Sequence, residues 1–272
     1  MSTTPGKTAD NVARTVGGAR YGAAMTLTTQ QCQDAITGHS TGFAEAVEGN
    51  LGASVEHCPG WTVADLTWHL TEVHWFWGTI VEELLESPPD QGLRPPRPDD
   101  AGLVAAFRAG AERLVRVLGE ANQSAHCWTW AGWKQDVAFV TRHQVQEAAV
   151  HHWDAAHAAG APWAVDPVVA ADSIDEFLHF SVASDDDPDD PVKPPLDGTL
   201  GLRCSDTGDA WTLSDGAREG TAKVSSGVAD GVPVVEASAS DLLLWLYGRV
   251  DVDTAAVDPA LLQRFREMCF TD

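Results

Sequence analysis

Three residues of this chain have the types and the spacing to hold a metal ion: His69, Glu147 and His151. Glu147 and His151 lie four residues apart in a segment of helical periodicity, so their side chains leave one helical face about a turn apart. His69 lies in a second predicted helix and supplies a third ligand if the two helices pack face to face. Two histidines and one carboxylate with an open fourth position are typical of catalytic rather than structural zinc.

Each of these residues also has a simpler structural interpretation. A lone histidine on an apolar helix face is more often a hydrogen-bonded core residue than a ligand. A hydrogen bond between Glu147 and His151 would satisfy both side chains and would leave His69 unexplained. The apolar stripe around His69 directs it inward, and the helix face of Glu147 turns polar where a bundle core is expected. Because a carboxylate is seldom buried unless it is paired or metal-bound, this combination favours the metal hypothesis.

The remaining histidines are expected to lie outside this site. His143 precedes Glu147 by four residues, but His143 and His151 would be about 12 Å apart along a helix axis, so one of the two cannot join a single ion. We expect solvated surface positions for the histidines that have no companion at ligand spacing: His39, His57, His74, His152 and His157.

The composition narrows the range of partners. A chain of 272 residues allows two domains with a sizeable core. Its net charge of −23 argues against nucleic acid and anionic membranes and favours a small-molecule partner. The sequence shows neither a signal-peptide pattern nor a transmembrane stretch of about 18 apolar residues, so we expect a cytoplasmic monomer or homodimer. Five cysteines without a CxxC pair indicate reduced thiols: Cys32, Cys58, Cys127, Cys204 and Cys269.

Four helices are predicted to position the three candidate ligands. The first two cover about 28–50 and 62–86, the third begins at Asp99 or Asp100, and the fourth carries Glu147 and ends at Gly160. Helices of this length predict a four-helix bundle, whose core is a common place for metal sites.

The pattern changes after residue 162. A helix over 166–180 and an acidic loop precede a predicted hairpin at 198–206 and 209–215, with further strands at 221–227 and 231–239. Ser240 is the expected cap of an amphipathic helix, and a last helix closes the chain. We therefore predict a disordered extension at 1–26, a four-helix metal-binding domain at 27–162 and an α+β domain at 163–272.

Three separated motifs resemble the mycothiol-dependent maleylpyruvate isomerase family. They are CPGWTVADLTWHL, an R-x4-E-x3-H-x-W-D segment that begins at Arg142, and SASDLLLWLYGR. The resemblance covers about residues 28–272 and implies a DinB-like four-helix bundle followed by a smaller sterol-carrier-like α/β domain. It also implies that His69, Glu147 and His151 are the metal ligands and that His143 is not. Relatives often carry a histidine directly before the ligand glutamate, where this chain has Gln146. This residue is expected to point off the metal face, so the metal site should persist while substrate or thiol contacts differ.

The resemblance implies a zinc-dependent enzyme, in which another divalent ion can replace zinc, with mycothiol as cosubstrate. Thiolate forms more readily near such an ion and then attacks an electrophilic small molecule. A maleylpyruvate cis-trans isomerase releases the thiol again, whereas a mycothiol S-transferase leaves it attached. Arg249 and Arg142 are the candidates for binding an anionic substrate, and Arg249 is equally suited to bind carbonyl groups at its helix end.

Two functions of other classes compete with this prediction. A metal-dependent hydrolase would activate water instead of a thiol. A non-catalytic carrier would hold its ligand in an apolar cavity of the second half, lined by residues such as Trp211, Trp245 and Leu246. Cys58, which precedes a Pro-Gly pair, is expected to be structural rather than nucleophilic.

Overall fold

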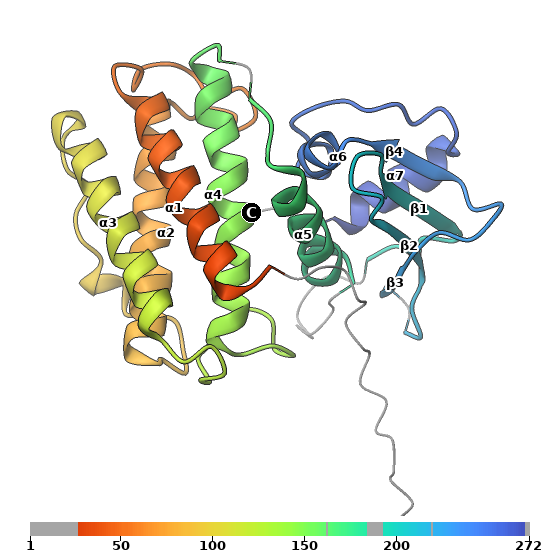
Figure 1. Ribbon diagram of the computed structural model, residues 1–272, viewed down its shortest axis with the longest axis horizontal. Coiled ribbons are helices and arrows are strands. Elements are labelled where there is room, and N and C mark those ends of the chain that lie inside the picture. The colour runs from red at the N-terminus through yellow and green to blue at the C-terminus, as the bar shows by residue number, and fades with distance from the viewer. Residues whose placement is uncertain (1–26, 162, 184–192, 219, 270–272) are drawn as a thin grey trace, which may run out of the picture.

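The computed structural model describes residues 27–161, 163–183, 193–218 and 220–269. The extension predicted at 1–26 and most of the acidic loop lie outside the described residues. A bundle of long helices occupies one side of the molecule and a small α/β unit the other, with α5 (Pro167–Phe177) between them (Figure 1). This arrangement confirms the predicted fold class.

Side-chain caps start each of the four bundle helices. The helices are α1 (Thr29–Val47), α2 (Val63–Glu83), α3 (Asp100–Glu120) and α4 (Val137–Ala158). The residue before each helix, Thr28, Thr62, Asp99 or Asp136, accepts a hydrogen bond from a backbone N–H of the first turn. Thr62 and Asp65 form a capping box, in which each side chain bonds the other residue's backbone N–H, at the start of the helix that carries His69.

Large apolar side chains fix the bundle helices against one another. Fully buried members come from all four helices: Ile36, Phe43, Leu66, Trp77, Phe107, Leu114 and Val140. Burial of one such side chain contributes about 1.5–3 kcal/mol, so a shift of α2 along α4 would cost several of these contributions. The packing therefore determines which polar residues of α2 and α4 meet.

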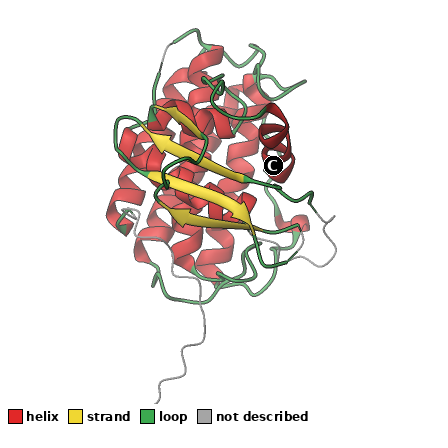
Figure 2. Cartoon of the chain, turned by 90° about the vertical axis from the view of Figure 1, so that its right-hand side faces the viewer, coloured by secondary structure: helices red, strands yellow, loops and turns green. Residues whose placement is uncertain are grey.

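The second half contains a four-stranded mixed sheet (Figure 2). Its strands are β1 (Thr199–Cys204), β2 (Ala210–Asp215), β3 (Ala222–Ser226) and β4 (Val234–Ala237), in the order β3-β2-β1-β4. The predicted β1–β2 hairpin is antiparallel, and β4 runs parallel to β1. Two helices complete this half: α6 (Ala239–Leu246) and α7 (Pro259–Met268).

One core joins the two halves of the molecule. Ala149 and Val150 of α4 share a buried cluster with Ile174 of α5 and with Trp211 and Trp245. The residues suggested as the walls of a carrier cavity, Trp211, Trp245 and Leu246, are thus part of a packed interior. Of the described helices, none is long and apolar enough to cross a membrane.

The predicted cap of α6 is wrong by two residues. Ser238, not Ser240, caps the helix by accepting a hydrogen bond from the backbone N–H of Asp241. Ser240 lies inside the helix, where its hydroxyl accepts a hydrogen bond from the backbone N–H of Val165. It therefore ties α6 to the segment that precedes α5.

Candidate metal centre

His69 on α2 and the pair Glu147 and His151 on α4 meet at one point between the helices. The Nε2 atoms of His69 and His151 lie 3.1 and 3.6 Å from Oε1 of Glu147. One ligand atom of each residue lies within 4.8 Å of those of the other two. Ligand atoms around a tetrahedral zinc ion with bonds of about 2.0–2.1 Å are roughly 3.3 Å apart, so this donor set fits such an ion.

The protonation of Glu147 suits a ligand. Burial raises the pKa of this carboxyl group, but the neighbouring His151 and the hydrogen bond with His69 outweigh it and lower the pKa to about 2. Glu147 is therefore a carboxylate at neutral pH. Without an ion, Glu147 and His69 are hydrogen-bonded to each other. The structural interpretation of the sequence had left His69 without a partner, and this contact provides one.

The buried carboxylate of Asp154 orients His151. Nδ1 of His151 lies 3.0 Å from Oδ2 of Asp154, whose side chain has no exposed area. This contact favours the proton on Nδ1 and leaves the lone pair of Nε2 directed at Glu147. Burial raises the pKa of Asp154, but hydrogen bonds with His151 and Arg249 lower it below its usual value.

Cys58, His151 and Asp154 form a second group whose ligand atoms lie close together. This group uses the opposite ring nitrogen of His151, and Asp154 is already bound to Arg249. Burial, followed by the charge of Asp154, raises the pKa of the Cys58 thiol, so Cys58 keeps its proton at neutral pH. The donor set of His69, Glu147 and His151 therefore fits a divalent ion better.

Arg249 reaches this site from the segment after α6. Its Nη2 and Nε atoms donate to the two carboxylate oxygens of Asp154 at 2.9 and 3.2 Å, and Nη1 donates to the carbonyl oxygen of Tyr247 at 2.8 Å. The structure thus gives Arg249 both a carbonyl contact near its helix end and a position at the metal site.

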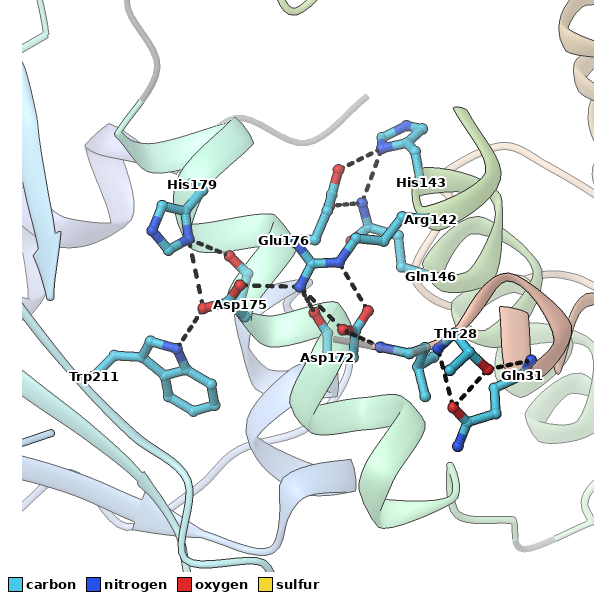
Figure 3. A network of polar contacts seen from close by, with 11 residues as sticks. Thr28, Gln31, Arg142, His143, Gln146, Asp172, Asp175, Glu176, His179 and Trp211 are labelled. Atoms are coloured by element: carbon cyan, nitrogen blue, oxygen red, sulfur yellow. Dashed lines mark hydrogen bonds and ion pairs between the residues drawn. The ribbon is translucent and has the colours of Figure 1, made fainter. Parts of the chain in front are cut away.

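Arg142 is not brought to the site. Its guanidinium donates to Asp172 at 2.9 Å and to Asp175 at 3.0 Å, both on α5 and both buried (Figure 3). Arg142 precedes Glu147 by five residues, so its side chain leaves α4 in a direction roughly 140° away from that of Glu147. It therefore faces α5 and not the candidate ligands. In the structure Arg142 thus joins the bundle to α5 and does not line the cavity of the candidate ligands.

His143 and Gln146 belong to a neighbouring network (Figure 3). Nδ1 of His143 lies 2.9 Å from Oε1 of Glu176, and the Gln146 amide contacts both residues. The Tyr247 hydroxyl donates to Oε1 of Gln146 at 2.6 Å. His143 is therefore held away from the ligand atoms. Gln146, which was expected to point off the metal face, links α4 to α5 and to the segment after α6.

Several of the other histidines differ from the surface positions expected for them. His39 and His74 are buried, with 8% and 2% of their surface exposed. His57 and His157 gather with Glu56 in a partly exposed group whose ligand-type atoms lie within 4.8 Å of one another. Roughly a hundred residues separate His57 from His157 along the chain, so spacing in the sequence carried no signal for this group.

The three candidate ligands and Arg249 line one cavity of about 260 Å³. Its other walls come from α2 and the loop after it, from the loop before α4, from α4, from the turn after α5 and from the end of α6. Six of the lining residues are Trp, Phe or Tyr: Trp75, Phe76, Trp77, Trp130, Phe180 and Tyr247. One wall contains Trp130 from the tryptophan-rich stretch CWTWAGW, and this composition is the signal by which the sequence could have indicated the wall.

Comparison with known proteins points to one family. Residues 33–156 match the family model described as the mycothiol maleylpyruvate isomerase N-terminal domain. A crystal structure of the mycothiol-dependent maleylpyruvate isomerase is 13% identical, with a TM-score of 0.56 over 82% of this chain and 90% of that chain. A histidine-to-alanine mutant of the same name is also 13% identical, with a TM-score of 0.57 over 86% and 95%. At this identity the likeness concerns the fold. No curated protein matches the chain.

Proposed function

Because residues 33–156 match the family model of the mycothiol maleylpyruvate isomerase N-terminal domain, we propose that the protein is a metal-dependent enzyme that adds mycothiol to an electrophilic small molecule. The observation that carries this proposal is the meeting of His69, Glu147 and His151 at one cavity. Their donor set leaves one side open toward the space where two small reactants can meet.

We propose that these three residues hold a zinc-like divalent ion. When bound there, the ion supplies a Lewis acid that favours the thiolate form of a thiol at neutral pH. Glu147 provides the negative charge of the donor set. Asp154 keeps the Nε2 lone pair of His151 directed at the site, and Arg249 compensates the charge of Asp154.

The cavity walls favour a thiol over water as the attacking group. Trp77, Phe76 and Val150 present apolar surface beside the candidate ligands. Such walls exclude solvent and hold two reactants together, which raises their effective concentration. This supports thiol addition rather than the hydrolysis that an open, water-filled site would favour.

Addition of the thiol sulfur to a carbon of a double bond is common to both candidate reactions. In isomerisation, the new C–S bond leaves a C–C single bond that rotates, and elimination of the thiol restores the double bond in the trans form. In transfer, the C–S bond is retained. We also propose that the protein acts in the cytoplasm, as a monomer or a homodimer.

Turnover with and without thiol tests the proposal. Metal-loaded protein is incubated with maleylpyruvate or with an activated haloarene, in the presence and absence of mycothiol, and the products are identified by mass spectrometry. We expect turnover only with mycothiol, and its loss in Glu147→Ala. Hydrolysis products without thiol would establish the hydrolase instead, and binding without any conversion would establish a carrier.

A further inference from the structure

The cavity of the candidate metal centre has an aromatic wall centred on Trp130. This side chain is 44% exposed, although large aromatic side chains are usually well covered. Trp130 lines the cavity together with Phe76 and Phe180, so part of its surface faces the space where a ligand would bind. An exposed apolar surface in a cavity often marks a binding site.

The rings around Trp130 are arranged as a platform. The ring centroids of Phe76 and Phe180 lie 6.2 and 6.3 Å from that of Trp130, with interplanar angles of 16° and 29°. Trp77 packs against Trp130 edge-on at 4.6 Å. Phe76 and Phe180 each lie within 29° of parallel to Trp130, and Trp77 supports the ring of Trp130 edge-on. A wall of such rings provides the offset-stacked and edge-to-face contacts that a planar aromatic group favours.

The arginines at the cavity are already paired with carboxylates. Among the described residues that line the cavity, the arginines are Arg94 and Arg249, and none is a lysine. Arg94 lies 2.5 Å from Glu72, and Arg249 is bound to Asp154. Each guanidinium therefore has its charge compensated by a carboxylate, and a dianion could pair with one only by displacing that carboxylate. The other cation of the proposed site is the divalent ion, whose open position the thiol occupies in the proposed function. The net charge of −23 on the chain adds long-range repulsion.

We propose that the preferred electrophile carries a planar aromatic group and no net charge, and that Trp130, Phe76 and Phe180 bind this group beside the candidate metal ligands. The proposal rests on the proposed function and specifies its substrate class. It favours the transferase outcome, because an aromatic ring with a leaving group has no cis double bond to isomerise.

The corresponding reaction is aromatic substitution. The thiol sulfur forms a bond with the ring carbon that carries the leaving group. The leaving group departs with its bonding electron pair, as chloride in the case of a chloroarene, and the thiol proton passes to solvent.

The first experiment compares two electrophiles on the metal-loaded full chain with mycothiol: uncharged 1-chloro-2,4-dinitrobenzene and dianionic maleylpyruvate. We expect a higher kcat/KM for the chloroarene. Trp130→Leu should lower that value by about three- to tenfold, mainly through KM, because one aromatic contact of about 0.5–1.5 kcal/mol is lost. Trp133→Leu is the matched control, since Trp133 is a similarly exposed tryptophan of the same loop that lines a different pocket. It should leave the kinetics unchanged.

The second experiment measures binding without any reaction. Titration calorimetry measures the affinity of 1,3-dinitrobenzene, which carries no halide to displace, for three metal-loaded proteins: wild type, Trp130→Leu and Trp133→Leu. Weaker binding in Trp130→Leu alone supports the aromatic site even if no thiol-dependent turnover is found, a result that would remove the proposed function only. Equal binding in all three proteins, together with mycothiol-dependent turnover of maleylpyruvate, would overturn the substrate class and leave the proposed function intact.

Discussion

The guanidinium of Arg249 lies 2.9 Å from the carboxylate of Asp154, and this pair connects the second half of the chain to the helix that carries two of the candidate ligands. Asp154 has no exposed side-chain area, and Arg249 has 10%. The pair is therefore a buried link between the candidate metal centre and the α/β unit.

Removing Arg249 should destabilise the protein. Arg249→Ala leaves the buried Asp154 without its cation, so we expect the free energy of unfolding to fall by about 3 kcal/mol in urea titrations. The double variant Arg249→Ala/Asp154→Asn should lose less than the sum of the single variants, because it removes the uncompensated charge. A loss below about 1 kcal/mol for Arg249→Ala would show that the pair behaves like a solvent-exposed one.

Asp154 should influence metal affinity without being a ligand. Asp154→Asn keeps the size of the side chain but weakens the hydrogen bond that orients His151. We expect zinc affinity to fall by roughly 10- to 100-fold in competition titrations with a chromogenic chelator. Unchanged affinity in a folded Asp154→Asn protein would show that His151 needs no such support.

Arg142 should matter for stability and not for catalysis. Arg142→Met removes the cation shared by the buried Asp172 and Asp175, so unfolding should require about 3 kcal/mol less. Metal content and mycothiol-dependent turnover should remain, because Arg142 does not line the cavity. Lost turnover in a folded, metal-loaded Arg142→Met protein would return Arg142 to the active site.

The sequence predicted those features that depend on local spacing. The i, i+4 relation of Glu147 and His151, the capped helix starts and the β1–β2 hairpin follow from backbone geometry within one element or between neighbours. The spacing places Arg142 on another side of α4 than Glu147, but that α5 covers this side with Asp172 and Asp175 depends on tertiary packing. The contact between Asp154 and Arg249 likewise joins residues far apart in the chain. Ser238 is followed three residues later by Asp241, as in a capping box, whereas Ser240 is followed by Leu243, so the local pattern favoured the cap that the structure shows.

Acid should destabilise the fold through two buried histidines. Burial lowers the pKa of His39 and of His74 to about 4, below the ordinary value of about 6.5 in an unfolded chain. Between about pH 6.5 and 4 the unfolded chain binds protons that the folded protein excludes. The free energy of unfolding therefore has its full value above about pH 6.5 and decreases as pH falls toward 4.

Each histidine can contribute up to about 1.4 kcal/mol per pH unit within this window. Urea unfolding at pH 7.5, 6 and 5 should show the decrease, and His74→Leu should make it shallower. An identical pH dependence in wild type and His74→Leu would contradict the assignment to His74.

Cys58 should be dispensable for turnover. Burial and the charge of Asp154 raise the pKa of its thiol, so little thiolate exists at neutral pH. Cys58→Ser should retain most mycothiol-dependent activity, measured alongside metal content and melting temperature. An inactive Cys58→Ser protein that still folds and binds metal would make Cys58 the nucleophile.

The metal content of purified protein, measured by mass spectrometry after loosely bound ions are removed, tests the central claim most directly. We predict close to one zinc-like ion per chain in wild type and in His143→Ala, and its loss in His69→Ala, Glu147→Ala and His151→Ala. A stoichiometric ion retained in all three folded ligand variants would contradict the proposed metal centre.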